Sequence, residues 1–371
     1  MITVPFCAQA QGDCVFSVPF LSFFPVRLPA ETGKKEETYM KLKRLGALLL
    51  SASLMLAALT ACGSKPAAND TAEDTKGADA AATDTAADDE ENYETGDASL
   101  DNPLNQDEIG ENELLVVSFG TSYNDSRRET IGAIEAAMQK AFPDYSVRRG
   151  FTSQIIIDHV NKRDGEKIDN VTEALDRAVD NKVKTLVVQP THLMNGLEYN
   201  DLKDELAGYS DSFEKIVLGD PLLTSDDDFQ KVMNAIVDAT KEYDDGETAI
   251  CFMGHGTEAE SNQVYTKMQE TLKAAGYDNY FVGTVEATPS LDDVIAAVKA
   301  GGYKKVVLRP LMIVAGDHAN NDMAGDEDGS WKTEFEKAGF EVTTVVEGLG
   351  SVQAIQDLFV AHAQAAIDSL K

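Results

Sequence analysis

Short apolar runs alternate with amphipathic stretches over the C-terminal two thirds of the chain. Four runs, most of them rich in valine and bounded by glycine or proline, lie at residues 114–119, 184–190, 248–254 and 304–310. Such runs are typical of strands that are buried on both faces of a sheet. The stretches between them, such as "SRRETIGAIEAAMQKAF", have apolar positions spaced near 3.6 residues. This alternation predicts a parallel sheet with helices on both faces.

The pattern occurs twice in the same order. "SFGT" and "GHGT" each close a strand, "TLVVQPTHLMNGLEYND" aligns with "KVVLRPLMIVAGDHANN" at a constant offset of 120 residues, and "RRGFTS" aligns with "FVGTVE". Three matches in one order indicate an internal duplication. We therefore predict an α/β fold with two similar doubly wound parallel-sheet domains, at residues 111–245 and 246–371.

The side chains that can bind a metal gather in the second of these domains. Aligned pairs are His255 with Phe119, Glu286 with Thr152 or Ser153, and His318 with Glu198. His255, Glu286 and His318 each follow a predicted strand, and the carboxyl ends of parallel strands share one edge, where ligands bind. Two imidazoles and a carboxylate suit a divalent first-row metal with open coordination positions. The alternative, hydrogen-bonded structural histidines, stays open at this point.

A secretion signal precedes the predicted domains. Basic residues, an apolar run and "LTAC" at residues 40–61 and Cys62 match a signal peptide with a lipobox, in which the cysteine is lipidated after cleavage. The alternative, a transmembrane anchor, fits less well because the apolar run is short for spanning a bilayer. Residues 1–39 have no signal character, so we interpret them as an upstream start that is miscalled, with Met40 as the true start.

Composition sets further limits on structure and partners. Residues 62–110 are mostly Ala, Asp, Thr, Glu and Gly, so we expect a disordered acidic linker after the lipidated cysteine. The net charge of −32 argues against nucleic acid as a partner. After removal of the signal only Cys62 and Cys251 remain, which leaves no disulfide framework and no cysteine metal cluster.

Several longer motifs resemble one known family. They occur in collinear order from about Leu114 to the C-terminus: "LLVVSFGTSYNDSRRETI", "FTSQIIIDHVNKRDGEKID", "QPTHLMNGLEYNDL", "FMGHGTEAE", "VGTVEATPSLDDVI", "LRPLMIVAGDHANNDMAGDEDGSW" and "GLGSVQAIQDLFVAH". Together they resemble the anaerobic-type sirohydrochlorin cobaltochelatases, which are class II chelatases. The resemblance implies a tetrapyrrole cleft between two similar domains and insertion of Co²⁺ into sirohydrochlorin, with release of two protons, in anaerobic cobalamin biosynthesis.

The resemblance also implies roles for individual residues. The family's metal ligands match His255, Glu286 and His318, and its proton acceptor matches His255. Co²⁺ is then the substrate metal, and no organic cofactor is expected. Histidine suits this task because its pKa lies near neutral pH and its neutral ring binds metals.

The substrate carries carboxylates, so an acidic protein needs local groups that bind it. Arg127 and Arg128 follow the "SFGTSYNDS" turn, and His192 lies at a strand end of the first domain. We expect these three to bind substrate, although a surface or structural role for each arginine stays open. Asn320, Asn321 and Asp322 fit the role of hydrogen-bonding braces of the loop around His318.

The predicted export does not match a cytoplasmic pathway. The chain is expected to be lipid-anchored to the outer face of the cytoplasmic membrane. A surface lipoprotein that binds haem, another tetrapyrrole or a metal for uptake is therefore the alternative, as is a chelatase for iron or nickel, since N/O ligands discriminate poorly between metals. The sequence does not determine the oligomeric state and leaves a homo-oligomer open.

Overall fold

The computed structural model describes residues 95–371. The predictions for the upstream start, the signal peptide, Cys62 and most of the linker lie outside these residues. No helix among residues 95–371 combines the length and the hydropathy that crossing a membrane requires.

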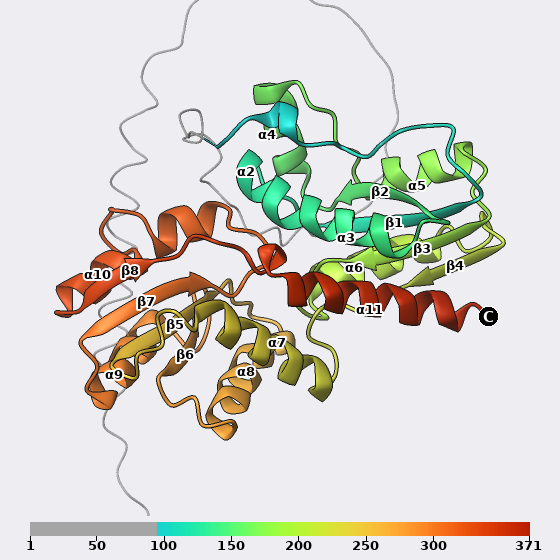
Figure 1. Cartoon of the computed structure of the whole chain (residues 1–371). Coiled ribbons are helices and arrows are strands. Elements are labelled where there is room, and N and C mark those ends of the chain that lie inside the picture. Colours follow the sequence, from blue (N-terminus) through green and yellow to red (C-terminus); the bar gives the residue numbers. More distant parts are fainter. Residues whose placement is uncertain (1–94) are drawn as a thin grey trace, which may run out of the picture. The chain divides into compact units, whose positions relative to one another are not determined.

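The N-terminal half is a parallel four-stranded sheet with helices on both faces (Figure 1). Its strands lie in the order β2-β1-β3-β4, with bounds β1 (Asn112–Ser118), β2 (Ser146–Phe151), β3 (Thr185–Pro190) and β4 (Lys215–Leu218). The helical elements are η2 (Ala98–Leu100), α2 (Asn124–Arg127), the π-helical turn η3 (Arg128–Gly132), α3 (Ala133–Ala141), α4 (Gln154–Asp164), α5 (Val171–Asp180) and α6 (Leu197–Ala207). Two of the predicted apolar runs are thus β1 and β3.

The C-terminal half repeats this arrangement. Its strands lie in the order β6-β5-β7-β8, with bounds β5 (Thr248–Gly254), β6 (Tyr280–Thr284), β7 (Lys305–Pro310) and β8 (Glu341–Thr344). The helical elements are α7 (Asp226–Thr240), η4 (Glu260–Asn262), α8 (Gln263–Ala274), α9 (Leu291–Gly301), the π-helical turn η5 (Ala319–Met323), α10 (Trp331–Lys337), η6 (Leu349–Ser351) and α11 (Gln353–Ser369). The predicted α/β fold with two similar parallel-sheet domains is confirmed.

The two sheets also agree in register. Leu114 pairs with Val187 in the first sheet, and Ile250 pairs with Val307 in the second. Because β3 and β7 are separated by the same 120 residues that relate their sequences, the alignment of the two halves describes equivalent positions in space.

Alternate residues of the central strands pack against different helices. On β1, Leu114 and Val116 face a core that includes α3 and α11, whereas Leu115 and Val117 pack against α5 and α6. On β5, alternate residues likewise divide between the core that includes α7 and α8 and the core that includes α9 and α10. Burial of both faces is the physical reason why these strands have no polar alternation.

The helices do not follow the boundary predicted between residues 245 and 246, although that boundary separates the two sheets. Helix α7 precedes the boundary but packs against α8, and α11 packs against α3, α7 and β3. Figure 1 shows α11 leaving the C-terminal half and running along the N-terminal half. One apolar core consequently includes residues of both halves.

Residues 95–110 differ from the linker that composition predicted. Leu104 is buried in the shared core, and its carbonyl oxygen accepts a hydrogen bond of 2.9 Å from Arg148 Nε. Asp101 accepts bonds of 2.6 Å from Arg127 Nε and Arg149 Nη1. This segment is held mainly by ion pairs with buried arginines, so its low content of apolar residues misled the prediction.

Candidate metal centre

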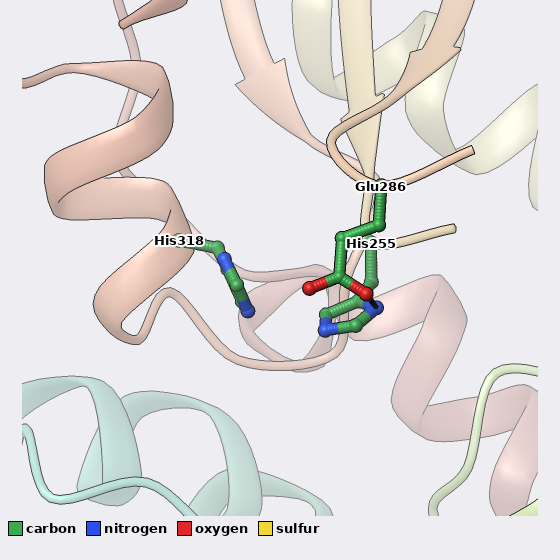
Figure 2. Close-up of side chains that lie close together, drawn as sticks. All are labelled: His255, Glu286 and His318. Carbon is green, nitrogen blue, oxygen red and sulfur yellow. Dashed lines mark ion pairs between the residues drawn. The ribbon is translucent and has the colours of Figure 1, made fainter. Parts of the chain in front are cut away.

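Three side chains from the ends of strands in the C-terminal half converge. His255 follows β5, Glu286 follows β6, and His318 lies in the loop after β7. Their potential ligand atoms all lie within 4.8 Å of one another. Figure 2 shows the three side chains pointing toward one another, with His318 entering from one side and His255 and Glu286 from the other. The structure thus brings together the trio that the sequence singled out; their role as ligands stays a prediction.

Backbone hydrogen bonds fix His255 and Glu286 side by side. Glu286 N donates to His255 O at 2.9 Å, and Val285 N donates to Gly254 O at 3.0 Å. The glycines on either side of His255 are required by their surroundings. A Cβ on Gly254 would lie 2.1 Å from the Tyr265 ring, and Gly256 has a φ of +91°, which other residues rarely adopt.

His255 is oriented by the backbone that follows it. Its Nδ1 lies 2.8 Å from Gly256 O, so Nδ1 carries the proton and donates it to the carbonyl. The other ring nitrogen, Nε2, is then the unprotonated atom that can bind a metal. A ligating histidine that donates its second nitrogen to a carbonyl or carboxylate is the usual arrangement in metal sites.

His318 is oriented in the same manner by a carboxylate. Its Nδ1 lies 2.6 Å from Asp322 Oδ2, four residues later, in the π-helical turn η5. This hydrogen bond, followed by the negative charges of Asp322, Asp317 and Glu286, raises the pKa of His318, against the opposing effect of burial. His318 thus presents Nε2 to the trio and holds a proton more tightly than an ordinary histidine.

The arrangement suits transient binding of a divalent cation. Two imidazole nitrogens and one carboxylate form the set, and the two rings lie with centroids 4.5 Å apart at 87°. First-row metal bonds of about 2.0–2.2 Å join ligand atoms up to about 4.4 Å apart, so small side-chain rotations suffice to close the set. All three side chains are partly exposed, which leaves coordination positions for a substrate.

The sequence assigned Asp322 to the loop as a brace and did not identify it as the partner of His318. The spacing of four residues was the available signal, because positions i and i+4 are neighbours on one helical face. Asn320 and Asn321 do act within the loop: Asn320 donates to Gly316 O at 2.8 Å, and Asn321 donates to Asp317.

Arg127, which we predicted to bind substrate, has a structural role. Its guanidinium is fully buried and donates to Asp101 at 2.6 Å, to Glu166 at 2.8 Å and to Thr121 O at 3.2 Å. The prediction is wrong for this residue, because two carboxylates and a carbonyl already occupy its donors and no surface is left for a substrate.

The two other predicted substrate-binding residues have different surroundings. Arg128 is partly exposed and pairs with Asp125 and Glu129 at 2.9 Å each. Neither ring nitrogen of His192 has a hydrogen-bond partner within the described residues. Burial lowers the pKa of His192 to about 4, so its ring is neutral at physiological pH. Their role toward a substrate stays a prediction.

Contacts join the two halves next to the trio. Ala315 N, three residues before His318, donates to Ser126 Oγ of the N-terminal half at 2.9 Å. A separate hollow of about 600 Å³ lies in the N-terminal half and is lined mainly by charged residues of the segment before β1 and of α5. It includes no member of the trio, and the cleft that we expected between the halves stays a prediction.

Comparisons with known proteins agree on one family. A family model described as cobalt chelatase (CbiK) matches residues 112–368. The "Sirohydrochlorin cobaltochelatase" of Salmonella typhimurium is 37% identical over 255 residues, which cover 69% of this chain and 96% of that protein. The "Sirohydrochlorin cobaltochelatase CbiKC" of Nitratidesulfovibrio vulgaris is 29% identical over 259 residues, which cover 69% and 91%.

A solved structure shows the same fold. The structure of SirB from Bacillus subtilis with Fe³⁺ matches with a TM-score of 0.50 and 12% identity, over 70% of this chain and 97% of that chain. At this identity the likeness concerns the fold alone.

Proposed function

Because the chain belongs to the cobalt chelatase (CbiK) family, we propose that it inserts Co²⁺ into sirohydrochlorin and releases two protons. The observation that carries the proposal is the convergence of His255, Glu286 and His318, in which Nδ1 of each imidazole has a hydrogen-bond acceptor and Nε2 is left to bind a metal. The relatives that match over nearly their whole length are named for this reaction.

The trio first holds the metal. Nε2 of His255, Nε2 of His318 and the carboxylate of Glu286 bind Co²⁺ and leave its other positions to the pyrrole nitrogens. N/O ligands on partly exposed side chains bind divalent metals without the closed coordination of a structural site, so transfer to the macrocycle remains favourable. Positioning of metal and ring in one register supplies much of the rate enhancement.

Two protons must leave the macrocycle for each metal that enters. As Co²⁺ moves from the trio to the pyrrole nitrogens, Nε2 of His255 becomes free and accepts one pyrrole proton. Its Nδ1 proton stays on the hydrogen bond to Gly256 O, so the ring becomes an imidazolium whose charge Glu286, at 3.7 Å, stabilises. The second proton passes to Glu286 or to water, and both are released before the next metal binds.

His192 is suited to contact the substrate. Its ring is neutral, and it has one donor and one acceptor that no group within residues 95–371 uses. A buried polar group without a partner costs free energy, so a substrate that supplies the partner binds more tightly. We assign Arg128, which lies near the start of the helix after β1, to the carboxylates of the substrate rim.

The test is metal insertion by the purified full chain. Sirohydrochlorin and Co²⁺ are added, and the change in visible absorption is followed for the wild type, His255→Ala and the control His159→Ala, whose histidine lies on α4 of the other half. We expect the wild type and the control to exceed the spontaneous rate and His255→Ala to lose most of this enhancement. Binding of the tetrapyrrole without insertion by the wild type would favour the uptake lipoprotein instead.

The same assay separates the candidate metals. Parallel reactions with Fe²⁺ and Ni²⁺ at equal concentration give kcat/KM for each metal, and a higher value for either would reassign the enzyme to that metal. The N/O ligand set alone does not discriminate strongly among these ions.

The lipid anchor is a separate proposal that rests on the sequence of residues 40–62. It places the enzyme on the outer face of the cytoplasmic membrane through a diacylated Cys62. Palmitate labelling of the wild type and of Cys62→Ser tests it, and labelling that persists in the variant would exclude Cys62 as the site.

A further inference from the structure

Three large apolar side chains are exposed at one edge of the N-terminal sheet. Phe119, Ile155 and Leu197 follow β1, β2 and β3 and have 49%, 56% and 66% of their surface exposed. They are half of the large apolar residues that are exposed within residues 95–371. Single exposed apolar residues are common, but three at the carboxyl edge of a parallel sheet lie where ligands bind in such folds.

These side chains lie at or within two residues of the positions that align with the metal trio of the other half. Ser153 N donates to Phe119 O at 3.2 Å, just as Glu286 N donates to His255 O at 2.9 Å. Phe119 is therefore the structural counterpart of His255, and Ile155 follows the counterpart of Glu286 by two residues. Leu197 directly precedes Glu198, which aligns with His318 because β3 and β7 have the same register in their sheets.

Contacts on two sides bring these edges of the two halves together. A Cβ on Gly316 would lie 3.2 Å from Thr121 Oγ1, which places the loop of His318 against the loop of Phe119. A Cβ on Gly196 would lie 3.6 Å from Ser261 Oγ, which places the residue before Leu197 against η4, in the segment that follows His255. The apolar trio and the metal trio thus belong to loops that meet.

We propose that Phe119, Ile155 and Leu197 form an apolar wall that holds one face of the tetrapyrrole while the metal trio approaches the other face. The proposal rests on the proposed function and names the group that positions its organic substrate. Insertion requires metal to enter the macrocycle through one face only. The opposite wall therefore needs no ligands, and it binds best by excluding water from an apolar, planar surface.

The wall explains why the two halves of the duplication diverged at these positions. A second set of imidazoles and carboxylates there would hold metal on the wrong side of the ring, away from the site that receives the pyrrole protons. An aromatic side chain at position 119 supplies a large contact area with little loss of conformational freedom. The carboxylates of the substrate rim then remain free for polar contacts outside the wall.

The test measures tetrapyrrole binding and metal binding separately in the full chain. Sirohydrochlorin is titrated without metal and followed by its fluorescence, and Co²⁺ is titrated without tetrapyrrole by calorimetry. The variants are Phe119→Ser, Leu197→Ser and the conservative Phe119→Leu. Leu100→Ser is the matched control, because Leu100 is 62% exposed but lies in η2.

We expect Phe119→Ser and Leu197→Ser to raise the Kd and the KM for sirohydrochlorin at least fivefold, while the Kd for Co²⁺ stays within twofold. Phe119→Leu should recover most of the affinity, and Leu100→Ser should match the wild type. If the wild type inserts cobalt and Phe119→Ser binds sirohydrochlorin as tightly as the wild type does, the apolar wall is refuted but the proposed function is not. An equal loss of Co²⁺ affinity in the variants also overturns it. A wild type that binds no sirohydrochlorin overturns the proposed function with it.

Discussion

The hydrogen bond between His318 and Asp322 offers the sharpest test of the metal centre. Asp322→Ala removes both the hydrogen-bond acceptor and the negative charge, whereas Asp322→Asn keeps a carbonyl oxygen that still accepts the hydrogen bond from Nδ1 of His318. Loss of such an outer partner costs metal affinity about 10–100-fold in other sites. The bond is short, at 2.6 Å, but the Asp322 side chain is 44% exposed, which reduces its electrostatic effect. We therefore expect about a tenfold loss for Asp322→Ala, or about 1.4 kcal/mol, and a smaller loss for Asp322→Asn.

The loss should depend on pH in a defined direction. Asp322 raises the pKa of His318, so in the wild type protons compete with Co²⁺ already above the ordinary range of histidine. Removing Asp322 lowers that pKa and moves the competition to more acidic pH. The ratio of the Kd of Asp322→Ala to that of the wild type should thus be largest near pH 8 and should shrink toward pH 6.

Calorimetric titration of Co²⁺ at several pH values measures this ratio. The control is Asp326→Asn, because Asp326 is an exposed acid of the same loop region that pairs with Lys332 at 2.5 Å and not with the trio. The reasoning is refuted if Asp322→Ala binds Co²⁺ within twofold of the wild type at pH 8 while its melting temperature is unchanged.

Three further predictions concern stability. Burial raises the pKa of Glu113 to about 8 from 4.5, so its contribution to stability is present below about pH 4.5 and is lost as pH rises toward 8. The free energy of unfolding of Glu113→Gln, measured with urea, should therefore rise relative to that of the wild type by a few kcal/mol between pH 5 and pH 8. A difference between the two proteins that does not change with pH would contradict this. Arg127→Ala should lower the free energy of unfolding by about 3–5 kcal/mol, because Glu166 loses its buried partner and Asp101 keeps only Arg149. A loss under about 1 kcal/mol would contradict the ion-pair role. Gly254→Ala should cost about 1–3 kcal/mol and weaken Co²⁺ binding, since its Cβ would meet the Tyr265 ring; normal Co²⁺ affinity would show that the turn tolerates a side chain.

The sheets and the trio could be predicted because their signals are local. Continuous apolar runs reveal strands that are buried on both faces, and parallel strands bring residues such as His255 and Glu286 to one edge whatever else the chain does. The repeated motifs added an alignment that the registers of the two sheets reproduce.

Features that depend on distant partners could not be predicted. Arg127 looks like a surface residue of a helix start, and its burial follows from Asp101 and Glu166, which lie 26 and 39 residues away. The apolar positions of α11, such as Ile355 and Phe359, predict a buried helical face but not that α3 and β3 of the first half cover it. Pairing across such separations is decided by tertiary structure.

The position of α11 affects the order in which the chain can fold. Its 17 residues are synthesised after every strand of both sheets, yet they complete the core of the first sheet. The N-terminal half thus lacks part of its hydrophobic core until α11 has been synthesised, which delays its stable folding. For a chain that we propose to be exported, this delay favours translocation of an unfolded polypeptide through a secretion channel, with folding completed after export.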